Sequence, residues 1–177
     1  MTGVARTGEE RILAPQDIIV TKTDLKGRIT YANSVFLDIS DLQESEALGK
    51  PHNIIRHPDM PAGVYKLVWD SLETNNEVFA YVKNQATSGA YYWVLAYVTP
   101  TYDAQGKRIG YHSSRRAINR QVLRTVEDTY RAMRAAEHGL TGRARGEASY
   151  ARLEETLAQA GMTYSQWFWS LTTGVAA

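Results

Sequence analysis

The feature that most constrains the fold of this chain is a strand with two apolar faces. Residues 91–99 read YYWVLAYVT, and successive side chains of a strand point to opposite faces of the sheet. One face then carries Tyr91, Trp93, Leu95 and Tyr97, and the other carries Tyr92, Val94, Ala96 and Val98. Because apolar side chains are driven out of water, both faces need a cover of protein.

Four further strands are predicted around this one. Residues 78–83 and 108–114 have strand composition and adjoin turns at Gly89 and Gly106. Earlier in the chain, residues 18–20 and 28–31 flank a turn closed by Gly27, which indicates a hairpin. We therefore expect a five-stranded antiparallel sheet.

Short helices are predicted between the hairpin and the later strands. Asn33 can cap a helix through Ile39, and residues 45–48 form one more turn. Residues 63–72 place Val64, Leu67, Val68 and Leu72 on one helical stripe. The fold class is therefore α+β, with the helices on one face of the sheet.

The C-terminal third is predicted to be helical. A stripe of apolar side chains indicates a helix from about Arg116 to Glu137, formed by Ile118, Val122, Val126, Tyr130 and Met133. A flexible joint at 139–146 and a helix ended by Gly161 follow. Thr163 and Gln166 then have the spacing of a capping box before Trp167-Phe168-Trp169.

These patterns divide the chain into four parts. We expect a short helical cap or loose arm (1–16), the main domain (17–117), a connector helix (118–138) and a helical appendage (139–177).

Composition excludes several classes of protein. The chain has 177 residues and no cysteine, which rules out disulfides, thiolate metal sites and a cysteine–flavin adduct. Its longest apolar run, 90–98, is well short of the roughly 18 residues of a membrane span, and no signal peptide is recognisable, so we expect a cytoplasmic protein.

The charge pattern does not favour a nucleic-acid partner. The formal net charge is +1, which is far from the strongly basic balance of dedicated nucleic-acid binders. Arg116, Arg120 and Arg124 recur every four residues, and we interpret them as a solvated helix face.

Residues 51–61, PHNIIRHPDMP, hold the densest group of chemically able side chains. Neither metal-ligand spacing nor a nucleophile elbow is present, so we predict neither a metal site nor an enzyme. Pro58 and Pro61 stiffen the segment, which would hold Arg56, His57 and Asp59 in a preset arrangement. Such a group suits a phosphorylated or hydroxylated ligand. Equally, the three side chains could bond to each other and pin the loop.

An amide and several aromatic side chains accompany this segment. Asn84 ends an apolar strand, and its side chain can offer a donor and an acceptor to a flat heterocycle. The alternative is an amide that caps the next turn. Trp69 and Tyr92 belong either to a ligand pocket or to an ordinary core.

The strings DLKGRITYAN, GKPHNIIRHPDMP, YVKN and YYW resemble the PAS sensor domain of the bacterial aerotaxis receptor family, over about residues 16–134. The resemblance implies non-covalent FAD binding and a redox or oxygen signal passed to a chemoreceptor or kinase-type partner. It implies that Asn84 meets the isoalloxazine edge, that Trp69 and Tyr92 pack the ring, and that Arg56, His57 and Asp59 hold the ribityl or phosphate side. Asn33 is the seventh matching cofactor position.

Two alternatives keep the PAS fold. Flavin-binding members usually carry tryptophan where this chain has Val78, which leaves room for haem with His52 or His57 as axial ligand. The other alternative is a cofactor-free dimerisation and interaction module. In every case the apolar sheet face and the 118–133 stripe predict a homodimer.

Overall fold

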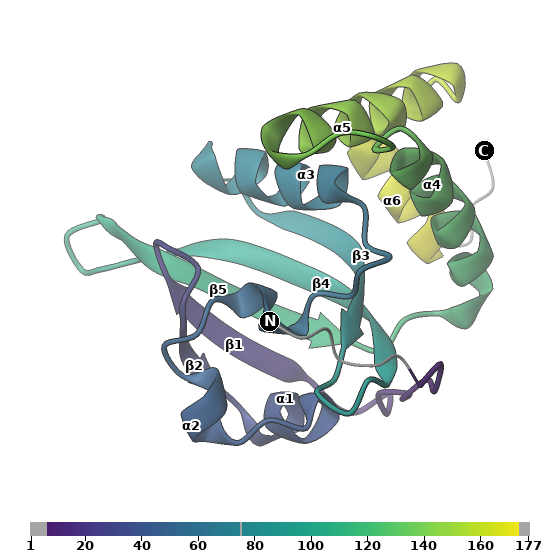
Figure 1. Ribbon diagram of the computed structural model, residues 1–177. Helices are drawn as coiled ribbons and strands as arrows, with labels where there is room; N and C mark the ends of the chain where they lie inside the picture. Colours follow the sequence, from purple (N-terminus) through teal and green to yellow (C-terminus); the bar gives the residue numbers. More distant parts are fainter. Residues whose placement is uncertain (1–6, 75, 174–177) are drawn as a thin grey trace. The chain divides into compact units, whose positions relative to one another are not determined.

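The predicted five-stranded antiparallel sheet is present. A computed structural model describes residues 7–74 and 76–173 (Figure 1). The strands are β1 (Ile19–Asp24), β2 (Ile29–Ala32), β3 (Val78–Gln85), β4 (Tyr91–Tyr102) and β5 (Arg108–Arg116). Their order across the sheet is β2-β1-β5-β4-β3. The N-terminal hairpin thus joins the later three strands by pairing β1 with β5.

The predicted hairpin turn is closed by a glycine and an aspartate. Gly27 has φ 73°, in the left-handed region that suits glycine. Asp24 Oδ1 accepts hydrogen bonds from the backbone N–H groups of Lys26 and Arg28, at 2.8 and 2.9 Å. The turn therefore satisfies its own backbone donors and fixes the register of the hairpin.

Short helices follow β2, in agreement with the α+β fold class. They are α1 (Ser34–Ser40), α2 (Glu44–Ala47) and the 3-10 helix η1 (His52–Ile55). Figure 1 shows α1 beside β1 and α2 beside β2, and these pairs of elements are in contact. The covered side of the sheet, which we call the core face, carries Tyr92 and Val94 of β4. These side chains are completely buried in one cluster with Phe36 and Ile55.

The other side of the sheet, which we call the second face, carries Trp93, Leu95 and Tyr97. The register places Phe79 of β3 opposite Tyr97, and their ring centroids are 4.8 Å apart. Alternation along β4 therefore separates two apolar faces as predicted.

The described part of the N-terminal segment is neither a helical cap nor a loose arm. The backbone of residues 9–11 pairs with β4, since Tyr91 N donates to Glu9 O at 2.9 Å and Arg11 N donates to Tyr91 O at 2.8 Å. Arg11 also pairs with Asp41 at 2.7 Å. This salt bridge and these hydrogen bonds explain why the segment lies in an extended conformation. Residues 1–6 lie outside the described residues.

The described residues form two compact units. The first comprises residues up to His57 together with Ser71–Ile118, and the second comprises Pro58–Asp70 and the residues from Asn119 onward. The division falls within α3 (Ala62–Glu73). The second unit also contains the 3-10 helix η2 (Arg120–Val122), α4 (Leu123–Ala135), α5 (Gly142–Gln159) and α6 (Tyr164–Thr173).

The connector helix begins later than predicted. Residues up to Arg116 belong to β5, because Arg115 pairs with Ile19 on one side and Ala96 on the other. Arg116, Arg120 and Arg124 consequently lie in a strand, a 3-10 helix and α4, so they do not form one helical stripe.

The apolar stripe of α4 is not an exposed face. Val122, at the end of η2, and Val126, Tyr130 and Met133 of α4 are all buried. The stripe therefore lacks the exposure on which the expected dimer interface depended, and the homodimer itself stays a prediction. The predicted joint is also shorter than 139–146, since α5 begins at Gly142. The capping box is confirmed, because Gln166 N donates to Thr163 Oγ1 and Thr163 N donates to Gln166 Oε1.

Candidate cofactor site

The backbone of the PHNIIRHPDMP segment brings Arg56 next to Asn84. Pro51 precedes η1, and a single β-bridge then pairs Arg56 with Asn84 of β3. A second bridge pairs Pro51 with Arg28. The segment is thus fixed at two points, and Arg56, Asn84 and the register partner of Asn84, Tyr92, are neighbours.

Asn84 is the most informative of the predicted residues. Its side chain lies on the core face and the residue is 3% exposed. Its Nδ2 group is buried and has no hydrogen-bond partner among the described residues. A buried donor without an acceptor costs about 1–3 kcal/mol, so the amide is suited to a ligand that supplies the acceptor.

Tyr92 is held in place by a second hydroxyl group. It is completely buried, and its hydroxyl oxygen lies 2.8 Å from Ser40 Oγ. Burial raises the pKa of Tyr92 to about 12, so the phenol stays neutral at physiological pH. The side chain of Tyr92 therefore has a fixed position in the core.

The amide of Asn33 has structural partners. Its Oδ1 accepts from the N–H groups of Val20 and Phe36, at 3.0 and 3.1 Å, and its Nδ2 donates to Ile18 O at 2.7 Å. These bonds join β1 to the first turn of α1.

The remaining predicted residues are distributed over both units. His57 is buried, and its ring meets Tyr91 edge-on at 5.9 Å, whereas Arg56 is exposed. Asp59 and Trp69 belong to the second unit, where Asp59 pairs with Arg134 at 3.3 Å and Trp69 is exposed on α3. Within the first unit, the structure brings Arg56, Asn84 and Tyr92 together.

The core face also carries a polar cluster that was not predicted from the sequence. Arg115 of β5 lies 2.7 Å from His52 Nε2 and 3.3 Å from Thr21 Oγ1, and the Thr21 and His52 atoms are 3.1 Å apart. Thr21 and Arg115 are buried, as is Ser113, whose Oγ has no hydrogen-bond partner among the described residues. The alternation of Tyr111, Ser113 and Arg115 along β5 is the signal that could have found this cluster.

The electrostatics of the cluster favour a neutral histidine. Burial, and then the charge of Arg115, lower the pKa of His52 well below its ordinary value of 6.5. A neutral imidazole can accept a hydrogen bond from Arg115 at Nε2. This arrangement occupies the nitrogen that the haem alternative would use as an axial ligand at His52.

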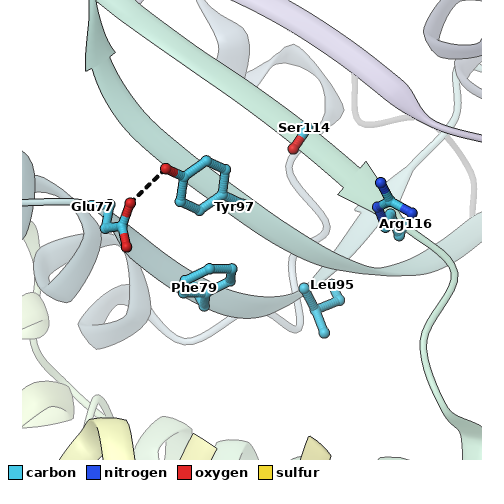
Figure 2. A pocket seen from close by; sticks show the side chains of 6 residues that line it. All are labelled: Glu77, Phe79, Leu95, Tyr97, Ser114 and Arg116. Atoms are coloured by element: carbon cyan, nitrogen blue, oxygen red, sulfur yellow. Dashed lines mark hydrogen bonds between the residues drawn. The ribbon is translucent and has the colours of Figure 1, made fainter. Parts of the chain in front are cut away.

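A pocket lies on the second face of the sheet. It has a volume of about 320 Å³ and is lined by Glu77, Phe79, Leu95, Tyr97, Ser114 and Arg116. Figure 2 shows the Tyr97 hydroxyl group donating to Glu77, at 2.5 Å, beside the Phe79 ring. None of the predicted cofactor residues lines this pocket.

The described part of the chain contains neither a metal-binding group of side chains nor a helix suited to a membrane. No three His, Asp or Glu side chains there are grouped as a metal site. No helix in residues 7–74 and 76–173 combines the length and apolar character needed to cross a membrane.

Comparisons with known proteins identify the domain. A family model described as the PAS fold matches residues 29–115. The aerotaxis receptor of Escherichia coli is 35% identical over 129 residues, which cover 73% of this chain and 25% of the receptor. The nitrogen fixation regulatory protein of Klebsiella pneumoniae is 26% identical over 114 residues, covering 64% of this chain and 23% of that protein. The chain thus spans about a quarter of the length of these relatives.

Solved structures agree on the fold. A PAS domain from Colwellia psychrerythraea covers 57% of this chain and 86% of its own, with a TM-score of 0.52 and 20% identity. The light state of the blue-light photoreceptor Aureochrome1 LOV covers 65% and 91%, with a TM-score of 0.54 and 20% identity. This chain therefore contains a PAS domain, and the domain is of the type found in the aerotaxis receptor.

Proposed function

We propose that this chain is a cytoplasmic sensory protein whose PAS domain binds FAD and reports redox or oxygen state to a signalling partner. The observation that carries the proposal is the buried Nδ2 of Asn84, which lacks a hydrogen-bond acceptor among the described residues. The similarity to the aerotaxis receptor supports the sensory role.

The core face has the donors that a flavin ring edge needs. Asn84 offers an amide N–H, and Ser113 offers a hydroxyl group that is likewise buried and unbonded among the described residues. Arg115 adds a buried positive charge, which favours any negative charge that develops on a bound group. Bound FAD would supply reversible uptake of electrons and protons at its isoalloxazine ring.

The residues of this chain would convert that change into a signal. Asn84 would orient the edge of the flavin ring. The Arg115 side chain would respond to a change in the charge of that ring. Arg115 is fixed to Thr21 and His52, so a change in its hydrogen bonding would alter contacts between β5, β1 and η1. The sheet and α4 are then the elements that we propose to present the signal to a chemoreceptor or kinase-type partner.

The absorbance spectrum of the purified full chain tests the proposal. We expect flavin bands, either as purified or after addition of FAD. Asn84→Ala should weaken FAD binding roughly tenfold, since one hydrogen bond to a buried donor is lost. Gln85→Ala is the matched control, because this amide neighbours Asn84 on β3 and alternation places it on the opposite face. Its affinity should match that of the wild type.

Other spectra would identify the alternatives. A Soret band that is lost in His57→Ala would indicate haem. A colourless protein that takes up neither FAD nor haem would contradict the sensor proposal and leave the interaction module. For the redox step, hydrogen exchange should differ between the oxidised and chemically reduced flavin-bound protein; identical exchange would contradict signalling by redox state.

A further inference from the structure

The core face has a second polar region, formed by Thr21, His52, Ser113 and Arg115, which we call the Arg115 cluster. Arg115 pairs in the register with Ala96, which alternation along β4 places on the core face. Arg115 Nη2 lies 2.7 Å from His52 Nε2 and 3.3 Å from Thr21 Oγ1. Ser113 Oγ is buried without a hydrogen-bond partner among the described residues, so it can donate to a ligand. All four residues belong to the first compact unit.

The Arg115 cluster lies at a distance from Asn84 on the same face. Asn84 pairs with Tyr92 and Arg115 pairs with Ala96, so the two residues are four positions apart along β4. They are also two strands apart across the sheet. Strand geometry makes this separation about 13 Å along the strand and about 10 Å across it. One small group cannot contact both residues, so Asn84 and the Arg115 cluster suit opposite ends of an extended ring system.

The Arg115 cluster supplies one positive charge. Arg115 is 6% exposed, and a guanidinium group stays protonated in proteins. His52 adds no charge, because burial and then the charge of Arg115 lower its pKa well below the ordinary value of 6.5. Thr21 and Ser113 are neutral hydroxyl groups. A single buried cation is compensated best by a single negative charge, because any excess charge in the core is left without a partner.

We propose that the Arg115 cluster binds reduced FAD in preference to oxidised FAD and thereby sets the redox potential of the sensor. The inference rests on the proposed FAD function. Reduction by two electrons from an external donor, with one proton taken from water to form an N–H bond, gives the neutral ring one negative charge. Arg115 therefore stabilises the reduced form by charge, whereas it has no such interaction with the oxidised ring.

The diphosphate group of FAD is the other source of negative charge. It carries more than one charge, so a single guanidinium group would leave part of that charge buried and uncompensated. Its charge is also the same in both oxidation states. If Arg115 held the diphosphate, it would strengthen the binding of both forms equally and leave the redox potential unchanged. The two sources of charge can thus be distinguished by experiment.

The midpoint potential of the full chain with bound FAD tests the proposal. It is measured by reduction with dithionite, which is oxidised to sulfite, in the presence of a reference dye. Arg115→Gln removes the charge and should weaken the binding of reduced FAD about tenfold more than that of oxidised FAD. This ratio corresponds to a midpoint potential about 30 mV below that of the wild type. Arg115→Lys keeps the charge and should restore most of the difference.

Arg116→Gln is the matched control. Arg116 is the next residue of β5, is exposed, and lines the pocket on the second face. This substitution removes the same charge from the same strand on the opposite side of the sheet. The midpoint potential of Arg116→Gln should therefore equal that of the wild type.

The wild type gives a test that does not depend on the stability of a variant. Its midpoint potential should lie above that of free FAD, because the difference in affinity between the two oxidation states shifts the equilibrium toward the reduced form. A wild type that binds FAD without this increase overturns the inference alone. So does an Arg115→Gln variant that loses affinity for both forms equally or keeps the wild-type potential. A wild type that takes up no FAD overturns the proposed function together with the inference.

Discussion

At the scale of single residues, the core face places a cation beside a neutral imidazole. Burial of the imidazole ring first, and then the charge of Arg115, oppose protonation of His52. The pKa of His52 is lower in the folded chain than in the unfolded one. Above about pH 6.5, His52 is neutral in both the folded and the unfolded chain, so this group does not lower the free energy of unfolding. As the pH falls below 6.5, the unfolded chain binds a proton that the folded chain does not, so stability falls.

We therefore expect His52→Gln to flatten the acid limb of the stability profile. The wild-type free energy of unfolding should fall by up to about 1.4 kcal/mol per pH unit below pH 6.5 from this group, and the variant should lack this slope. Chemical denaturation at a series of pH values measures it. His112→Gln is the control, because the pKa of His112 is lowered less strongly than that of His52. Equal slopes for wild type and His52→Gln would contradict the assignment.

Tyr92 and Ser40 form one unit at the same scale. Removal of either hydroxyl group leaves the other buried without its partner, which costs about 1–3 kcal/mol. Tyr92→Phe and Ser40→Ala should therefore each destabilise the fold by that amount. The double variant should cost little more than either alone, because the two residues share one hydrogen bond. Additive losses in thermal or denaturant unfolding would show that the hydroxyl groups act separately.

At the scale of elements, alanine substitutions at two glycines of the second unit should have opposite effects on stability. A Cβ on Gly63 of α3 would meet the backbone of Ser149 and Tyr150 at 2.5–2.7 Å, whereas a Cβ on Gly146 of α5 would find its nearest neighbour at 3.9 Å. Gly63→Ala should thus force α3 and α5 apart and destabilise the protein. Gly146→Ala should stabilise it by about 0.5–1 kcal/mol, since alanine is the better helix former. Melting temperatures that shift in the same direction for both would contradict this helix contact.

The sequence predicts elements well where the pattern is local. The hairpin at Gly27, the cap at Asn33 and the capping box at Thr163 depend on neighbouring residues, and all three are confirmed. The end of β5 was missed because Arg115 is a charged residue at a buried position, and only its distant partners Thr21 and His52 explain it.

The candidate site shows the same limit. Asn84 and Arg56 could be matched to a family pattern, and the structure makes them neighbours. The pairing of Asp59 with Arg134, and of Glu137 with Ala62, joins residues 75 positions apart in the sequence. Local sequence periodicity cannot predict contacts between residues so far apart in the chain.

At the scale of the whole molecule, burial of the α4 stripe changes what a self-association experiment should find. Val126 is completely buried, and a carboxylate introduced there would lose its hydration with no partner provided. Val126→Glu should therefore cost several kcal/mol, a large part of the typical 5–15 kcal/mol stability of a protein. We expect loss of the cooperative melt in circular dichroism. Arg124→Glu, at an exposed position of the same helix, should keep the wild-type melt.

The predicted homodimer then depends on the second face of the sheet, where Phe79, Leu95 and Tyr97 line the open pocket. Leu95→Glu places a charge among these half-buried side chains and should halve the mass measured by light scattering, while leaving the melt cooperative. A wild type that is monomeric throughout the concentration range would refute self-association. If Val126→Glu instead converts a dimeric wild type into a folded monomer, the dimer interface lies on α4. A carboxylate buried at that position could not be accommodated in a folded chain.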